Sequence, residues 1–459
     1  MTRADNARPI ARPSAINRRQ FLTTGALAGA ALLTGAPTRA ASPSVGRASR
    51  PNVLFITTDQ QGLDTLSAYG CRDVATPNLD RLARSGVSFM ESYTANPLCS
   101  PARSSWFTGR MPSETGVITN GIPIRSDVPN LGQWLGEQGY ETIYTGKWHM
   151  PGSFTSDIPG FKVIPTGIGG QGNMGDAAVS RACEGYLRNR SRTSPFFLAA
   201  SLLQPHDICQ WVSMHWNAAD ELPYPEIADR LPPLPPNFAF DPSREPRKVA
   251  NFRRPSWSER QWRYYLWSYY RHVEMVDAEI GRILRALEDS GEAANTLIVL
   301  TSDHGEGRGR HHMTLKNYLY DEAAKVPLIV AWPGKMLANK QDRRTLVSGV
   351  DIVPTICDYA GVKSPPKMRG LSLRPSLEGD RPMPRLFVAA EVTVNGRMVR
   401  SPNYKYIAYK GDPVEQLFDM AADSGETKNV ASEPKYAGAL AEHRKLLEQW
   451  EAQLDVAAT

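Results

Sequence analysis

The chain has 459 residues, of which 41% are hydrophobic and 22% are charged, as in an ordinary globular protein. Its formal net charge of +6 lies mostly at the front, because residues 1–40 hold six arginines and one aspartate. The remainder is nearly neutral, which excludes a nucleic-acid-binding role based on overall charge. The length suffices for one large α/β domain and a smaller second domain.

The first forty residues have the pattern of an export signal. Arg18 and Arg19 precede a short apolar run over 21–33, and small residues follow at Ala40 and Ala41. This arrangement is typical of a cleaved twin-arginine signal peptide, and an uncleaved N-terminal anchor is the alternative. No later apolar run approaches the roughly 20 residues of a membrane-spanning helix. We therefore expect a periplasmic or secreted mature protein, exported by the twin-arginine machinery, with no membrane span and no nucleic-acid partner.

A buried strand predicted over 52–58 is followed directly by Asp59 and Gln60. Its apolar side chains run without alternation, as in parallel strands that are covered on both faces. Ligands bind at the carboxyl ends of such strands, so Asp59 is a candidate site residue. A helix predicted from Pro77 and a strand predicted over 87–93 come next.

The stretch Cys99-Ser100-Pro101-Ala102-Arg103 predicts a helix start, with Ser100 as N-cap and Pro101 in the first helical position. Cys99 then lies where free backbone N–H groups and the helix dipole favour negative charge. A nucleophile at this place would hold an anionic substrate well. The chain has five cysteines, whose spacings match no zinc pattern, and the odd count leaves one for chemistry.

The pattern Cys-x-Pro-x-Arg, followed by Thr108-Gly109, resembles the signature of the sulfatase family, within the alkaline-phosphatase-like superfamily. The resemblance implies that a maturation enzyme oxidises Cys99 to formylglycine, whose hydrate attacks a sulfate ester. Twin-arginine substrates usually fold before export in a reducing compartment, so we expect no structural disulfides.

Cationic and imidazole side chains follow two further predicted strands. Lys147 and His149 point to the same side of an extended chain, and His206 follows another buried strand. Alone, a Lys–His pair is more often a surface feature, and a histidine in the place of His206 is structural about as often as functional. The motifs Gly-Lys-Trp-His and Pro-His resemble those of sulfatases, in which the second contacts the sulfate ester. Many sulfatases have a proline two residues after this histidine, and Ile208 takes that place here.

A second buried strand ends at Asp303 and His304. Together with Asp59 and Gln60, these side chains predict a divalent metal site, for which hard oxygen donors favour Ca²⁺ first and Mg²⁺ or Mn²⁺ next. Sulfatases have such a site, and the resemblance adds the modified Cys99 to its ligands. Gln60 departs from the commoner acid pair and lowers the charge of the site by one. His304 occurs in some branches and weakens the case for Ca²⁺.

Lys316 comes thirteen residues after Asp303, where sulfatases have a lysine that contacts the sulfate. Four basic residues between them face either the same anion or solvent: Arg308, Arg310, His311 and His312. A proline-rich, irregular insertion over 211–257 and the helix predicted after it over 258–289 contain five tryptophans: Trp211, Trp216, Trp257, Trp262 and Trp267. These rings would suit an anionic sugar, but packing of the insertion onto the domain is the favoured interpretation.

The resemblance also implies a role for each site residue. Arg103, Lys147 and Lys316 stabilise the charge that grows on the sulfate. His206 protonates the leaving alcohol, and His149 assists the release of sulfate.

The predicted fold is a mainly parallel, doubly wound α/β sheet followed by a small C-terminal antiparallel α+β subdomain. We expect a signal peptide over 1–40, a catalytic domain over 50–390 and the subdomain over 391–459. The predicted activity is sulfate ester hydrolysis, with a sulfated carbohydrate as the expected substrate. The alternatives are an aryl or alkyl sulfatase, a phosphonate or phosphate ester hydrolase of the same superfamily, and a non-catalytic protein that binds sulfated glycans.

Overall fold

The computed structural model describes residues 50–166, 171–222, 224–252, 255–379, 381 and 383–456. The predicted signal peptide over 1–40 lies outside the described residues. From Arg50 onward the chain forms one compact unit. Within the described residues, no helix combines the length and apolar character that crossing a membrane requires.

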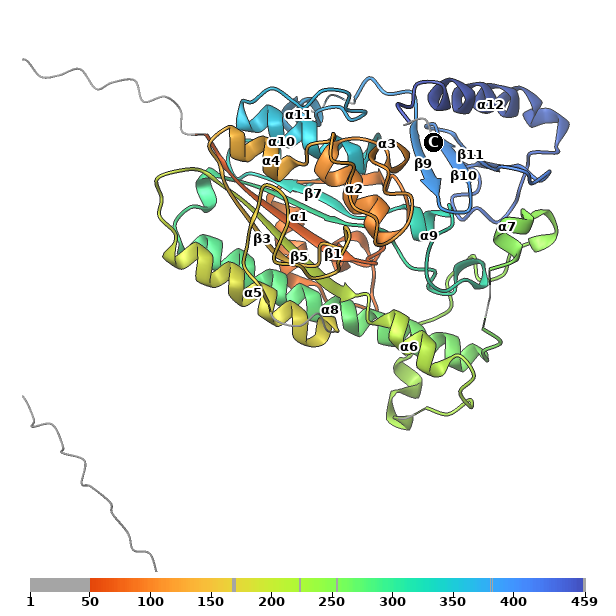
Figure 1. Ribbon diagram of the computed structural model, residues 1–459. Coiled ribbons are helices and arrows are strands. Elements are labelled where there is room, and N and C mark those ends of the chain that lie inside the picture. Colours follow the sequence, from red (N-terminus) through yellow and green to blue (C-terminus); the bar gives the residue numbers. More distant parts are fainter. Residues whose placement is uncertain are drawn as a thin grey trace, which may run out of the picture. The chain divides into compact units, whose positions relative to one another are not determined.

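An eight-stranded sheet forms the centre of this unit (Figure 1). Its strand order is β4-β3-β5-β1-β6-β7-β2-β8; β7 is antiparallel to both neighbours and the other pairs are parallel. The strands are β1 (Asn52–Asp59), β2 (Val87–Tyr93), β3 (Glu141–Gly146), β4 (Lys162–Val163), β5 (Phe196–Pro205), β6 (Thr296–Ser302), β7 (Leu328–Ala331) and β8 (Lys340–Ser348). The predicted mainly parallel α/β fold is confirmed.

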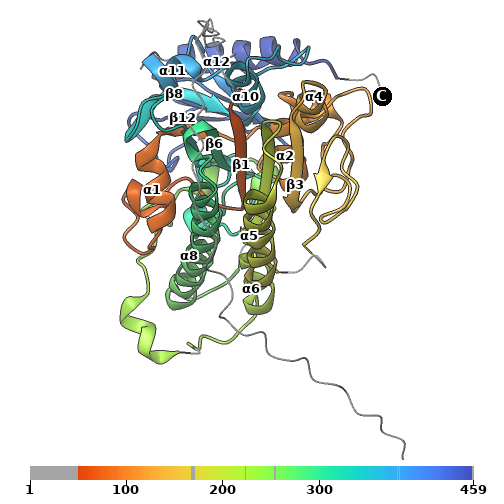
Figure 2. The same ribbon diagram turned by 90° about the vertical axis from the view of Figure 1, so that its left-hand side faces the viewer.

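Helices cover both faces of this sheet, which explains why its strands are apolar throughout. One face packs against α1 (Pro77–Ser85), α5 (Gly172–Asn189) and α8 (Glu259–Asp289). The other face packs against α2 (Cys99–Thr108), α4 (Leu131–Glu137), α10 (Ile352–Ala360) and α11 (Arg374–Gly379). Figure 2 shows α5 and α8 running side by side across the sheet, and their residues are in contact.

The insertion predicted to be irregular holds only short helices among its described residues. They are the end of α6 (Ile208–His215), α7 (Arg247–Ala250) and two 3-10 turns. The helix after the insertion begins where the sequence predicts it. The Ser258 hydroxyl accepts from the backbone N–H of Gln261, and the Gln261 side chain accepts from the Ser258 N–H, which together cap α8.

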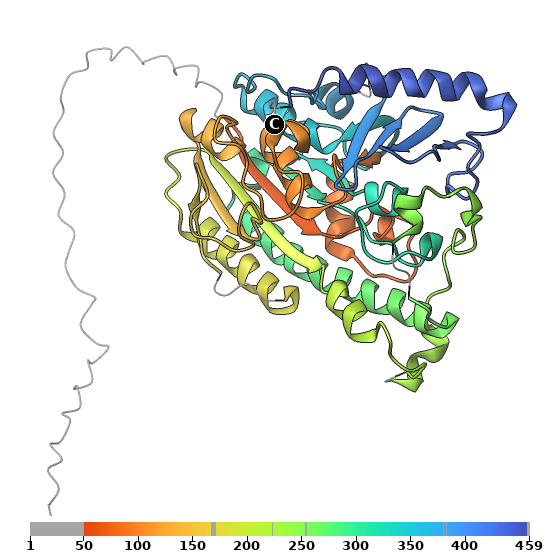
Figure 3. The same ribbon diagram turned by 45° about the vertical axis from the view of Figure 1, so that its right-hand side comes forward.

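A second sheet follows, with four antiparallel strands in the order β12-β11-β10-β9. They are β9 (Val388–Val392), β10 (Gly396–Arg400), β11 (Tyr404–Tyr409) and β12 (Gln416–Asp419). Helix α12 (Ala437–Glu451) packs on one face through Leu440 and Leu447, and lies along this sheet in Figure 3. The other face shares a core with Tyr93 and Leu346 of the large sheet. The predicted antiparallel α+β region is confirmed.

Candidate active site

The two aspartates predicted to share a site are brought together by strand register. β1 and β6 are adjacent and parallel, and Thr58 is paired with Ser302. The next residue on each strand is therefore an aspartate, Asp59 on one and Asp303 on the other. Both carboxylates are fully buried at the carboxyl ends of their strands.

Four side chains converge at this edge. Ligand atoms of Asp59, Cys99, Asp303 and His304 all lie within 4.8 Å of one another, and all four residues are buried. The Cys99 sulfur is 3.2 Å from His304 Nε2 and 3.9 Å from a carboxylate oxygen of Asp59. Two carboxylates and an imidazole are a donor set that suits a divalent cation, so these residues fit the predicted metal.

Helix α2 brings Cys99 to this cluster, but its cap differs from the prediction. The helix begins at Cys99 itself, and Leu98 occupies the N-cap position without a side-chain hydrogen bond. The Ser100 hydroxyl instead donates to the carbonyl oxygen of His149 at 2.6 Å. The predicted N-cap role of Ser100 is wrong, because its hydroxyl holds the neighbouring chain at His149.

Arg103, one turn along α2 from Cys99, lies behind the two carboxylates. Its guanidinium donates to Asp59 at 3.0 Å and to Asp303 at 3.1 Å through two nitrogens. Its remaining donor nitrogen contacts the Lys147 carbonyl at 2.8 Å and the Ser201 hydroxyl at 2.7 Å. Every guanidinium nitrogen thus has a protein partner. These contacts orient the aspartates, and direct contact of Arg103 with sulfate stays a prediction.

Lys147 reaches the same cluster from the end of β3. Its ammonium lies 2.6 Å from Asp59 Oδ2. The approach depends on Gly146, which is paired with Ser201 and has a φ of +99°. A Cβ at this position would lie 1.9 Å from the Ser201 carbonyl oxygen, so only glycine fits.

Cations set the electrostatics of the cluster. Burial alone would raise the pKa of Asp59, but Lys147 and the other cations hold it well below its usual range. Burial and the Asp59 charge likewise oppose ionisation of Cys99, yet Lys147 and Lys316 hold its pKa well below the ordinary thiol value. Burial and the nearby Asp59 charge raise the pKa of Asp303. The site therefore favours negative charge at Asp59 and at the position of Cys99.

The two predicted proton carriers differ in environment. Burial lowers the pKa of His206 to about 3, so its imidazole is neutral in the free protein. His149 has a left-handed backbone with φ of +71°, and its buried Nδ1 has no hydrogen-bond partner among the described residues. Backbone strain and an unpartnered buried nitrogen are features that accumulate at functional sites.

Gln60 and Lys316 contact each other. The Gln60 side-chain oxygen accepts from the Lys316 ammonium and from the Cys209 thiol, the latter at 3.2 Å. The side-chain nitrogen of Gln60 donates to Glu306. Coordination of a metal by Gln60 stays a prediction. The sequence analysis did not anticipate Ser201 or Glu306 as site residues, and for Glu306 the only available signal was its place directly after Asp303-His304-Gly305.

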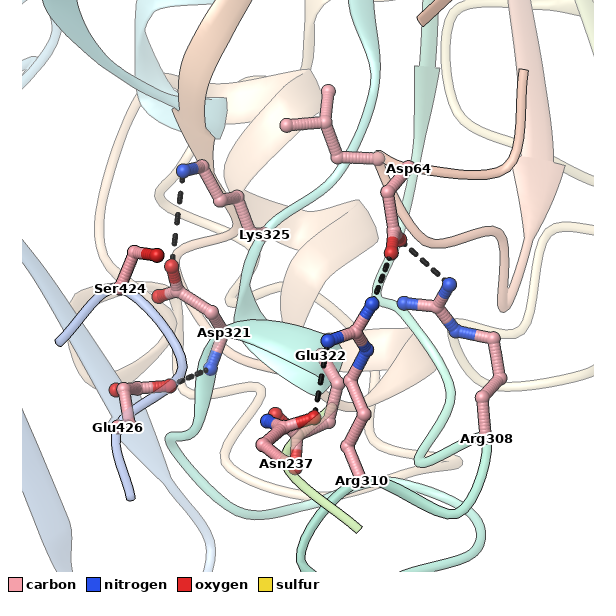
Figure 4. A pocket seen from close by; sticks show the side chains of 10 residues that line it. Asp64, Asn237, Arg308, Arg310, Asp321, Glu322, Lys325, Ser424 and Glu426 are labelled. Atoms are coloured by element: carbon pink, nitrogen blue, oxygen red, sulfur yellow. Dashed lines mark hydrogen bonds and ion pairs between the residues drawn. The ribbon is translucent and has the colours of Figure 1, made fainter. Parts of the chain in front are cut away.

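Of the four basic residues between Asp303 and Lys316, Arg308 and His311 are buried and His312 is exposed. Arg308 and Arg310 both pair with Asp64 at 2.6 Å, beside a polar pocket of about 160 Å³ (Figure 4). His311 is buried and lies 2.8 Å from Glu322. Figure 4 shows that side chains from segments that follow strands of both sheets line this pocket. None of these side chains belongs to the cluster around Cys99. Arg308 and His311 therefore neither face the anion that Lys316 is predicted to contact nor lie in a solvated loop.

The tryptophans of the insertion pack onto α8 of the main domain, as favoured from the sequence. Trp257 and Trp262 are nearly buried, with ring centroids 4.9 Å apart. Trp211 and Trp216 contact the same cluster, which also includes Val212 of α6.

Two family models match the chain: Sulfatase over residues 51–362 and N-sulphoglucosamine sulphohydrolase, C-terminal, over residues 309–453. The first alone spans more than half of the chain. The chain belongs to the sulfatase family. It is therefore a sulfuric ester hydrolase by family, and the cluster around Cys99 is the candidate active site of this sulfatase.

Curated relatives and solved structures agree with this assignment. A Delta 4,5-hexuronate-2-O-sulfatase from Bacteroides thetaiotaomicron is 34% identical, covering 87% of this chain and 89% of the relative. An N-acetylglucosamine-6-O-sulfatase from the same organism is 26% identical over 90% of this chain and 88% of the relative. A solved structure of a 2-O GAG sulfatase matches with a TM-score of 0.80 and 32% identity, covering 89% of this chain and 93% of that one. A phosphonate monoester hydrolase of Agrobacterium radiobacter matches with a TM-score of 0.75 and 26% identity, over 88% and 96%.

Proposed function

We propose that this sulfatase removes the 2-O-sulfate from a hexuronate of a sulfated glycan, with Cys99 converted to formylglycine. The observation that carries the substrate is the 34% identity to the Delta 4,5-hexuronate-2-O-sulfatase over nearly the full length of both chains. The clustering of Asp59, Cys99, Asp303 and His304 supports the chemistry. We further propose export by the twin-arginine route, on the basis of Arg18 and Arg19 before a short apolar run.

A divalent cation, Ca²⁺ by preference, would be held by Asp59, Asp303, His304 and the modified Cys99. Gln60 is also a predicted ligand, although its side-chain oxygen accepts from Lys316 and Cys209 in the free protein. When bound, it would polarise the sulfate and favour the deprotonated nucleophile. Formylglycine supplies that nucleophile as the hydroxyl of its hydrate.

We propose a role for each of the other side chains. Lys147 and Lys316 bind the sulfate and stabilise its growing negative charge. Both ammonium groups already lower the pKa of the Cys99 thiol by attracting its negative charge. Arg103 keeps the two aspartates in place through three hydrogen bonds. The scissile O–S bond breaks as the alcohol oxygen takes a proton from His206.

The proton on His206 requires the substrate. In the free protein burial keeps this imidazole neutral, with a pKa of about 3. A sulfate ester adds negative charge beside His206 and favours its protonated form. The buried Nδ1 of His149, which has no partner among the described residues, supports the proposed role of His149 in the release of sulfate.

The test has two arms on one preparation of the exported protein. The mass of the peptide that carries Cys99 shows whether the thiol has become an aldehyde. Sulfate release is then compared between a 4,5-unsaturated disaccharide sulfated at O-2 of the uronate and its isomer sulfated at O-6 of the hexosamine. We expect an aldehyde and a clear preference in kcat/KM for the 2-O-sulfate. An aldehyde with the opposite preference would refute the substrate, and an active unmodified thiol would refute the chemistry.

A phosphonate or phosphate ester hydrolase is the second candidate, favoured by the 26% identity to the phosphonate monoester hydrolase and by the Asp303–His304 pair. An aryl phosphonate in the same assay decides between the two. Turnover of the phosphonate above that of 4-nitrophenyl sulfate and of both disaccharides would favour this second function.

A further inference from the structure

Glu306 is a buried carboxylate that the reaction described above does not use. It follows β6 by four residues and has no exposed surface. Among the described residues no lysine, arginine or histidine forms an ion pair with it. Three neutral donors contact it instead: one carboxylate oxygen accepts from the Gln60 amide, and the other from the Tyr265 hydroxyl and the Leu315 backbone N–H. Both carboxylate oxygens act as acceptors, so the hydrogen bonds of all three donors depend on this group.

The first contact fixes the orientation of the Gln60 amide. Because Glu306 accepts from the amide nitrogen, the amide oxygen must face the opposite way. That oxygen accepts from the Lys316 ammonium. A flipped amide would place oxygen against carboxylate oxygen and nitrogen against ammonium, so both contacts would be lost.

The contact with the Leu315 N–H holds the chain that carries Lys316. Leu315 and Asn317, on either side of it, have left-handed backbones with φ of +64° and +76°. Asparagine adopts this conformation readily, but for the bulky Leu315 it is costly and persists only where contacts impose it. Glu306 accepts from the Leu315 N–H, and the Asn317 N–H donates to the Pro97 carbonyl at 3.0 Å.

We propose that Glu306 is the positioning residue for Lys316, holding both the amide that accepts from its ammonium and the backbone that precedes it. The inference rests on the proposed role of Lys316 in binding the sulfate. Loss of Glu306 should therefore weaken sulfate binding only as long as Lys316 is present.

A double-mutant cycle tests this dependence, with Glu306→Gln, Lys316→Ala and the combined variant. Glutamine at 306 keeps the shape but puts an NH₂ group against one of the three donors. We expect kcat/KM to fall about tenfold or more in Glu306→Gln, in the range found for groups that orient a site from outside it. The combined variant should match Lys316→Ala within about twofold, since the two groups act as one unit. Inhibition by free sulfate should weaken in Glu306→Gln to nearly the extent seen in Lys316→Ala.

Two further variants keep the test decisive. Glu322→Gln changes another buried carboxylate, which contacts His311 outside the cluster, and should leave kcat/KM within about twofold. Glu306→Asp retains the charge if Glu306→Gln does not fold, and should recover part of the sulfate affinity. The proposal would be overturned if the fold-losses in kcat/KM of the two single variants multiplied in the combined variant. Equal losses of kcat/KM in Glu306→Gln and Glu322→Gln would overturn it as well. A wild type that carries the aldehyde at Cys99 and releases no sulfate would instead refute the proposed function.

Discussion

Replacing Arg103 by methionine should destabilise the protein strongly in the absence of metal. The guanidinium is 1% exposed and forms five hydrogen bonds, three of them to carboxylates. Its loss would leave Asp59 and Asp303 buried with Lys147 as the nearest cation. Removing one partner of such a buried group typically costs about 3–5 kcal/mol.

That free energy converts into a measurable shift. Unfolding a domain of about 400 residues carries an entropy of roughly 0.8 kcal/mol/K, at about 2.1 cal/mol/K per residue. We therefore expect the apparent Tm of Arg103→Met in EDTA to fall by about 4–6 °C. Calcium should then raise the Tm of the variant more than that of the wild type, because the bound cation is no longer repelled by the positive charge of Arg103.

Arg374→Met is the matched control. Arg374 also pairs with two carboxylates, Asp358 at 3.1 Å and Glu378 at 3.0 Å, but its side chain is 44% exposed. Exposed pairs contribute at most about 1 kcal/mol, which corresponds to roughly 1 °C here. Thermal melts of the three proteins in EDTA and in calcium provide the comparison. Equal Tm losses in the two variants in EDTA would refute the reasoning.

Three other outcomes are expected. Gly146→Ala should lower the Tm and the activity far more than Gly139→Ala. Both glycines have positive φ, but only at Gly146 would the added Cβ lie 1.9 Å from a backbone oxygen, that of Ser201. Thermal melts and sulfate-release assays compare the two variants. Burial raises the pKa of Asp176 from 3.8 to about 7, so folding stability should decline as pH rises from about 4 to 7, and urea titrations should show a flatter pH dependence in Asp176→Asn. His206→Ala should lower kcat more for a sugar sulfate than for 4-nitrophenyl sulfate, whose leaving group needs no proton; equal losses would remove His206 as the acid.

The convergence of the two aspartates was predictable because it follows from one local rule. Each ends a continuous apolar strand, and parallel strands present their carboxyl ends at the same edge. Adjacent pairing of β1 and β6 was not needed for the prediction, but it makes the two carboxylates direct neighbours. The same rule placed Lys147, which follows β3, at this edge.

Helix α5 was missed because its local signals conflict. Gly172, Gly175 and Gly185 weaken its intrinsic helix propensity. Its buried residues Val179, Cys183 and Leu187 nevertheless recur every fourth position, which is the spacing of one helix face. Packing against α8 and the sheet stabilises this helix despite its glycines.

The contacts of Glu306 could not be predicted from the sequence, because they join three segments by packing alone. Gln60 follows β1, Tyr265 lies on α8, and Leu315 precedes Lys316 far along the chain. No periodicity links these positions, and only the seating of α8 on the sheet brings the Tyr265 hydroxyl to the carboxylate. The ends of parallel strands thus bring Asp59, Asp303 and Lys147 to one edge, whereas the packing of α8 adds the Tyr265 hydroxyl to the donors on Glu306.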